Sequence, residues 1–381
     1  MSINTPNRNS QPTVRRIVAR ITKEIIGQER FNQYRKNRAL VNEGRQLHQS
    51  RLEHMVEVRE PLLLISQIQR SGGTLLSQLF DGHPQCHAHP SELKVGYPVK
   101  ENWPLLSLNS QPEHWFDTLF ESISHEFFRE GYSKYSKGAA ETDPKTGLRT
   151  VNRNNYNVYP FLFLSTLQKA IFLRCIERRG VKSERDIFNA YMTSYFNAWL
   201  DNQNLYSSPK KFVTAFTARL SMQPENLDKF FAVYPDGKLV SLVRDPRSWF
   251  LSARRHSQQE YGNIEEAIRL WNLSTSSAIN AREKFGDRVY VMSFEELVED
   301  TEAAMRRLAG YMGIDFSSEL TFPTFNGFPI KADSSFAVKN YGVLKEPIQR
   351  YKELLKDDEI SYINERALGL YEDALALKVK V

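Results

Sequence analysis

The chain has 381 residues, of which 41% are hydrophobic and 25% charged, and its net charge is +6. This length suits one large or two ordinary domains, and the composition is that of a globular protein. The small positive excess suits an anionic ligand but is no nucleic-acid signature, so we expect no nucleic-acid partner. Two cysteines exclude a disulfide framework and favour a reducing, cytoplasmic compartment. No apolar run is long enough to cross a bilayer.

Residues 1–57 are polar and rich in arginine, and apolar residues between positions 14 and 25 recur at helical spacing. One interpretation is a basic amphipathic helix that makes peripheral contact with an anionic membrane or acts as a transit peptide. The other is a helix that packs on the domain or on a second subunit of a homo-oligomer. Glu24, Glu29 and Glu43 dilute the basic character and favour the second interpretation. We therefore predict a basic helical extension over residues 1–57.

The pattern changes at Pro61, where a main domain over residues 58–381 begins. Pro61–Ile68 is a short apolar run, which is typical of a buried parallel strand. It leads into the glycine-containing turn Gln69–Thr74 and then into a helix that stops near Pro84. Such an order gathers backbone N–H groups around one point, where an oxyanion can bind.

Strand and helix patterns alternate through the rest of the domain. Residues 101–210 form a mostly helical, aromatic-rich insert. Three further strands are expected at 211–216, 238–243 and 288–293. Helices are expected at about 247–256, 263–285, 301–312 and 357–377. This alternation predicts an α/β fold with a P-loop-like parallel β-sheet flanked by helices.

The turn at Gln69–Thr74 is not a Walker A motif. That motif places a lysine before the serine or threonine, whereas Gly73 precedes Thr74 here. A metal-dependent nucleoside triphosphatase is therefore disfavoured, and the turn is either a metal-free anion site or an ordinary glycine turn that starts a helix.

A second anion site is suggested by the segment Val243–Ser252. Arg244 ends an apolar strand, Pro246 suits the first turn of a helix, and Ser252 lies two turns further on. A guanidinium and a hydroxyl so arranged can grip a phosphate. The alternative is that Arg244 and Asp245 form a structural ion pair and cap.

The two motifs together resemble those of the sulfotransferase family that uses 3′-phosphoadenosine-5′-phosphosulfate (PAPS). Gln69–Leu76 is similar to the family's 5′-phosphosulfate loop, and Leu242–Arg247 with Ser252 is similar to its 3′-phosphate segment. The resemblance covers about residues 58–100 and 211–375, and its style is closest to the carbohydrate, tyrosylprotein and bacterial branches. It implies metal-free, in-line transfer of a sulfuryl group from PAPS to a hydroxyl or amine of an acceptor, such as a glycan or small metabolite.

The resemblance also implies roles for individual residues. Arg70 would stabilise charge on the leaving phosphate, while Arg244 and Ser252 would bind the 3′-phosphate. The residues implied for the 5′ end of PAPS are Arg70, Ser71, Gly72, Gly73, Thr74 and Leu75.

An acceptor hydroxyl needs a base. Glu92 is the first candidate, because it stands near the place of the glutamate base in the tyrosylprotein and carbohydrate branches. His89 ranks second and His87 third, and the alternative is a polar loop that only shapes the cleft. Many relatives carry a basic residue at the end of the second strand; here either Arg219 replaces it or that contact is absent.

Two other classes of function stay open. One is a metal-dependent P-loop kinase of a small molecule. The other is a non-catalytic nucleotide-binding scaffold in which the basic N-terminus is the working part. The resemblance to a fold family cannot name the acceptor.

Overall fold

The protein is described from a computed structural model that covers residues 21, 23–24, 27–95, 101–121, 132–133, 140–142, 149–151, 158–159, 161–336, 338 and 340–377. Most of the apolar pattern predicted to be helical at 14–25 lies outside these described residues. The chain divides into two compact units, Met1–Met55 and Val56–Val381. The first unit contains helix α2 (Gln28–Glu53), so part of the predicted extension is helical.

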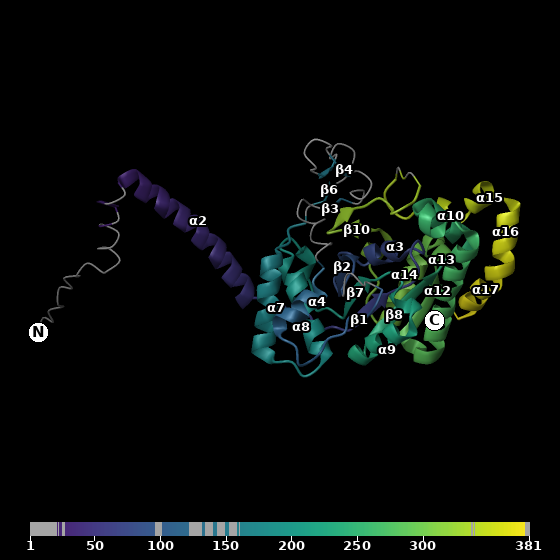
Figure 1. Ribbon diagram of the computed structural model, residues 1–381, viewed down its shortest axis with the longest axis horizontal. Helices are drawn as coiled ribbons and strands as arrows, with labels where there is room; N and C mark the ends of the chain where they lie inside the picture. Colours follow the sequence, from purple (N-terminus) through teal and green to yellow (C-terminus); the bar gives the residue numbers. More distant parts are fainter. Residues whose placement is uncertain are drawn as a thin grey trace, which may run out of the picture. The chain divides into compact units, whose positions relative to one another are not determined.

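A five-stranded parallel sheet forms the centre of the larger unit, with the strand order β2-β7-β1-β8-β9 (Figure 1). Its strands are β1 (Leu62–Ile65), β2 (Cys86–Glu92), β7 (Phe212–Phe216), β8 (Lys238–Val243) and β9 (Val289–Ser293). Strand β1 lies in the middle and is buried along its whole length. The predicted α/β fold with a parallel sheet is therefore confirmed.

Helices flank this sheet. The helix that follows the turn at Gln69–Thr74 is α3 (Gly73–Leu79). The later helices are α9 (Pro224–Val233), α10 (Pro246–His256), α11 (Gln258–Tyr261), α12 (Ile264–Phe285), α13 (Phe294–Glu299), α14 (Thr301–Met312), α15 (Tyr351–Leu354), α16 (Asp357–Ile363) and α17 (Gly369–Ala376), with a π-helical turn at Asn364–Leu368. Short 3₁₀ turns lie at Gln203–Tyr206, Leu220–Met222, Gly286–Arg288, Ser318–Thr321 and Glu346–Ile348. Helices α3 and α14 pack on one face of the sheet, where the side chains of alternate strand positions form the main apolar core.

In the described part of residues 101–210, helices α4 (Pro112–Leu119), α7 (Ser165–Arg179) and α8 (Glu184–Ala198) gather near the β2 edge of the sheet (Figure 1). Short two-stranded pairs also occur. They are β3 (Tyr132–Ser133) with β6 (Val158–Tyr159), β4 (Ala140–Thr142) with β5 (Arg149–Val151), and, beyond the insert, β10 (Thr324–Phe325) with β11 (Phe328–Pro329). Within the described part of the chain, every helix is too short or too polar to span a membrane. Cys86 and Cys175 are buried free thiols.

Strand β2 was not predicted, because its sequence lacks an apolar run and contains Pro90. Proline cannot donate a ladder hydrogen bond and is therefore tolerated mainly at sheet edges. In the described sheet β2 is an end strand, and its register with β7 shifts between Ala88 and Glu92. The segment that looked like a polar loop is thus an irregular edge strand.

Strand alternation sends Ala88 into the core beside α3 and turns His87 and His89 toward α8. The His87 ring is 3% exposed and lies 5.0 Å from the Phe196 ring. Burial lowers the pKa of His87 to about 3, with a smaller contribution from the charge on Lys210. The carboxylate of Glu60 lies 3.9 Å from Nε2, which is too far for a hydrogen bond, so burial dominates.

We predict that His87 makes the protein less stable in acid. Between its lowered folded pKa and the value of about 6.5 in the unfolded chain, the unfolded state binds the extra proton, so stability falls by about 1.4 kcal/mol per pH unit below pH ~6.5. Urea unfolding measures the free energy of unfolding at pH 7 and at pH 5. Between these pH values it should fall by about 2 kcal/mol less in His87→Gln than in wild type. The exposed His114 on α4 provides the control His114→Gln. Equal pH dependence in wild type and His87→Gln would contradict the prediction.

Candidate functional site

The turn after β1 has an unusual backbone that only glycine accommodates at two positions. Gly72 has a φ of +99°, and a Cβ there would lie 2.4 Å from Cδ2 of Phe294. A Cβ on Gly73 would lie 2.3 Å from Cε2 of Phe216. Arg70 also has a positive φ, of 68°, which is uncommon outside glycine. The turn is therefore held in one shape by rings from two neighbouring segments.

Arg244 joins this turn to the carboxyl end of β8. Its Nη1 donates to the backbone carbonyl of Arg70 at 2.8 Å, and its guanidinium lies 4.4 Å from the centre of the Phe294 ring. The two segments that the sequence predicted as anion sites thus meet at the same end of the sheet. Burial lowers the pKa of Arg244 to about 10, the carboxylate of Glu295 opposes this shift, and the like charges of Arg70 and Arg350 add to it.

Two buried indoles fix the carbonyl groups on either side of this junction. Trp249 Nε1 donates to Gln69 O at 2.8 Å, and Trp271 Nε1 donates to Arg244 O at 3.0 Å. Asp245 caps α10 by accepting from the backbone N–H of Arg247 at 2.8 Å and also pairs with the Arg247 guanidinium. The cap that the alternative interpretation expected is present, but the ion pair is formed with Arg247.

A loop after β11 approaches the junction from the C-terminal part of the chain. Ser335 Oγ donates to the backbone carbonyl of Ser252 at 3.0 Å, which fastens this loop to α10. The Phe336 ring lies between two guanidinium groups, 4.5 Å from that of Arg255 and 4.6 Å from that of Arg350. The predicted site residue Ser252 is buried beneath this contact.

Several arginine side chains lie near the junction between the turn and Arg244. Arg70 is paired with Asp333, whose Oδ2 lies 3.3 Å from Nη1, and the Arg70 Nη2 donates to the Asp333 carbonyl at 3.0 Å. Among the described residues, Nε of Arg70 and Nη1 of Arg350 are buried without a hydrogen-bond partner. Buried N–H groups rarely stay unsatisfied, so these atoms fit an anionic ligand. No role was predicted for Arg350, which lies 106 residues beyond Arg244 in the chain.

Within the described residues, no cluster of His, Cys, Asp and Glu side chains is arranged to hold a metal ion.

Glu92 lies at the same end of the sheet as these arginines. Its partner in β7 is Phe216, whose own partner in β1 is Ile65, the last residue of that strand. Since adjacent strands are ~4.8 Å apart, the Glu92 backbone lies about 10 Å from that of Ile65. The carboxylate is only partly buried, and the sheet thus brings Glu92 to the end where the arginines gather.

The other predicted residues, His89, His87 and Arg219, are either buried or paired with acidic side chains. The His89 side chain is 0% exposed, and its ring nitrogens face the Ser91 carbonyl and the Glu121 carboxylate. His87 is buried against α8, as described above. Arg219, which was expected to supply a positive charge, forms ion pairs with Glu101 and Glu260.

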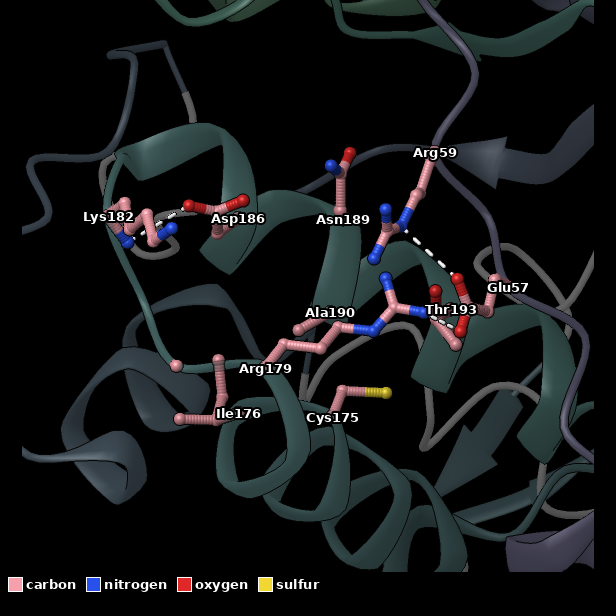
Figure 2. A pocket seen from close by; sticks show the side chains of 11 residues that line it. Glu57, Arg59, Cys175, Ile176, Arg179, Lys182, Asp186, Asn189, Ala190 and Thr193 are labelled. Atoms are coloured by element: carbon pink, nitrogen blue, oxygen red, sulfur yellow. Dashed lines mark hydrogen bonds and ion pairs between the residues drawn. The ribbon is translucent and has the colours of Figure 1, made fainter.

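A separate pocket of about 280 Å³ lies beside the segment that enters β1, at the opposite end of that strand from Arg70 (Figure 2). Figure 2 shows Arg59 and Arg179 pointing toward Glu57, which pairs with both of them. Burial raises the pKa of the Cys175 thiol in this pocket to about 11, so the thiol is protonated at neutral pH. This pocket shares no residue with the predicted site.

Comparison with known proteins gives a family match. A sequence model of the sulfotransferase family matches residues 61–318, which includes Arg70, Glu92, Arg244 and Ser252. No curated protein matches the chain.

Several solved structures are similar. The sulfotransferase domain from the Synechococcus PCC 7002 olefin synthase is 15% identical, with a TM-score of 0.43, over 86% of this chain and 98% of that one. The sulfotransferase domain from the curacin biosynthetic pathway is 14% identical, with a TM-score of 0.41, over 81% of this chain and 98% of that one. Retinol dehydratase in complex with androsterone and inactive cofactor PAP is 14% identical, with a TM-score of 0.34, over 84% of this chain and 82% of that one. Similarity at this level fixes neither donor nor acceptor.

We predict that Gly73→Ala distorts the turn, because the added methyl group overlaps the Phe216 ring. Overpacking of this kind typically costs about 1–3 kcal/mol of unfolding free energy. Gly310→Ala in α14 is the matched control, since nothing lies within 4 Å of its added Cβ, and it should be neutral or slightly stabilising. Chemical denaturation of both variants measures the difference, and equal stabilities would contradict the steric argument.

Proposed function

The chain belongs to the sulfotransferase family, and we propose that it is an enzyme that transfers a sulfuryl group from PAPS to a hydroxyl or amine of an acceptor. The observation that carries the choice of donor is the hydrogen bond between Arg244 Nη1 and the Arg70 carbonyl. It unites two arginine-bearing segments into one site, as a nucleotide with separate 5′ and 3′ anionic groups requires.

The roles follow from the position of each group. Arg70 and the turn Ser71–Leu75 would bind the 5′ end of PAPS, and the Arg70 guanidinium would stabilise negative charge on the departing phosphate. Arg244, Ser252 and, in addition, Arg350 would bind the 3′-phosphate. The buried Nε of Arg70 and Nη1 of Arg350 support this assignment, because each has a hydrogen to donate and no partner among the described residues.

Glu92 would accept the proton from the acceptor. It is the best placed of the three candidate bases, because the sheet brings it to the arginine end while His87 and His89 are buried on the α8 side of β2. A partly solvated carboxylate can take up a proton during transfer and lose it afterwards. We propose a glycan or a small metabolite as the acceptor.

We predict that 3′,5′-adenosine bisphosphate (PAP), the desulfated product, binds in calorimetry and that Arg244→Ala weakens it at least 30-fold. Loss of one buried charged donor costs roughly 2–4 kcal/mol. Arg269→Ala is the control, because Arg269 is an exposed arginine paired with Glu266 on α12. Equal affinity for PAP and AMP, or unchanged PAP binding in Arg244→Ala, would overturn the assignment of the 3′-phosphate site.

We predict further that transfer depends on Glu92. With an acceptor panel of glycans and small hydroxyl compounds, mass spectrometry should detect sulfated product with PAPS and no phosphorylated product with ATP and magnesium. Glu92→Gln should lower the transfer rate by a factor of about 10²–10⁴ and leave PAP affinity unchanged. Product from ATP alone would favour a kinase instead, and an unaltered rate in Glu92→Gln would remove Glu92 as the base.

A further inference from the structure

A buried polar network contacts the chain on both sides of Glu92. The side chains of His89 and Glu121 are both 0% exposed, and His89 Nε2 lies 3.3 Å from Glu121 Oε1. The His89 ring also stacks on the Tyr195 ring, with 4.6 Å between their centres. These residues come from β2, from the segment after α4 and from α8, so the network ties the edge strand to the insert.

The contacts of His89 limit where the protons of His89 and Glu121 can lie. His89 Nδ1 lies 2.9 Å from the carbonyl oxygen of Ser91, and Nε2 faces a carboxylate oxygen, so both ring nitrogens face acceptors. A neutral imidazole has one N–H and can serve only one of them. Both contacts are hydrogen bonds only if the imidazole is protonated on both nitrogens, or if Glu121 carries a proton and donates it to Nε2.

Two other donors favour the carboxylate form of Glu121. The Tyr191 hydroxyl donates to Oε1 at 2.9 Å, and the backbone N–H of Lys94 donates to Oε2 at 3.0 Å. Hydrogen bonds donated to a carboxylate stabilise its charged form. Burial, reinforced by the Glu121 charge, raises the pKa of Tyr191 and Tyr195 well above the usual value, so both phenols are neutral.

The network also holds the chain on both sides of Glu92. His89 fixes the Ser91 carbonyl on one side, and Glu121 fixes the Lys94 N–H on the other. Between them, the Leu93 N–H donates to the Phe216 carbonyl at 2.7 Å, and the Thr217 hydroxyl donates to the Leu93 carbonyl at 3.0 Å. The register of β2 shifts between Ala88 and Glu92. Beyond this shift, side chains as well as backbone hydrogen bonds hold the strand in place.

We propose that His89 is a positioning residue, an imidazolium paired with the Glu121 carboxylate, which fixes the segment 91–94 and so aims Glu92 at the acceptor. This proposal rests on the proposed function for the role of Glu92, but the ion pair itself does not. A buried pair of this kind is strongly destabilising when one partner alone is removed, because the other charge is left uncompensated.

The first test is nuclear magnetic resonance of the full-length chain with ¹⁵N- and ¹³C-labelled histidine, and it needs no variant for its main result. We expect both ring nitrogens of His89 to be protonated at neutral pH in wild type, and one to be deprotonated in Glu121→Gln. A single protonated nitrogen in the wild-type protein would overturn the proposal.

The second test uses hydrogen exchange and stability. The Lys94 amide should exchange at least tenfold faster in His89→Gln and in Glu121→Gln, and the double variant should be more stable than the sum of the single effects predicts. His87→Gln is the matched control, since it changes a buried histidine on the same face of the same strand and should leave the Lys94 amide protected. Equal exchange in His89→Gln and wild type would contradict the positioning role.

Catalysis gives the last readout. His89→Gln should lower kcat at least tenfold and leave PAP affinity unchanged, because the arginines that would bind PAP lie outside β2, after β1, after β8 and before α15. If the wild-type protein did not bind PAP, that result would count against the proposed function alone. The resonance and exchange results bear on the ion pair alone. An unchanged kcat with a perturbed Lys94 amide would show that the pair does not aim Glu92 and would overturn that part of the proposal.

Discussion

The hydrogen bond from Arg244 to the carbonyl of Arg70 is the constraint on which the site depends. It ties the turn after β1 to the end of β8, two segments 174 residues apart in the chain. Arg244 is fully enclosed, and a buried guanidinium is costly unless its donors are satisfied. The Glu295 carboxylate offsets part of that cost, since it favours the charged form of Arg244. The fold therefore accepts an unfavourable charge at the point where a nucleotide anion would compensate it.

The charges near this junction are unbalanced. Arg70 and Arg350 both oppose the charge on Arg244, and the acid paired with Arg70 is Asp333, whose side chain is 46% exposed. An exposed carboxylate contributes little to stability and is readily displaced by a more highly charged ligand. The loop that carries Asp333 is fastened to α10 through the hydrogen bond from Ser335 to the Ser252 carbonyl. The site thus combines Arg244, which is held rigidly after β8, with Arg70 on the turn, whose ion pair with Asp333 is weak.

The sequence predicted the parts of this arrangement that have local patterns. The apolar run before Gly72 and the Arg-Asp-Pro segment at Arg244 each combine a strand signal with a turn signal, and parallel strands bring their carboxyl ends together. Strand β2 was missed because an edge strand needs no continuous apolar run and accommodates Pro90. Contacts such as His89 with Glu121, or Phe336 with Arg350, join residues without any periodic relation, so no window of sequence reveals them.

The two halves of the proposed reaction are supported by different physical means. The donor side is built on β1 and β8, which are buried in the middle of the sheet and whose positions are fixed by regular ladders. Glu92 stands on the edge strand, where the ladder shifts register and a buried ion pair holds the backbone instead. An edge strand can change its side chains and local path without disturbing the central strands, because it has a neighbour on one side only. A sheet organised in this way can keep the proposed donor site on its central strands while the edge strand that carries Glu92 changes.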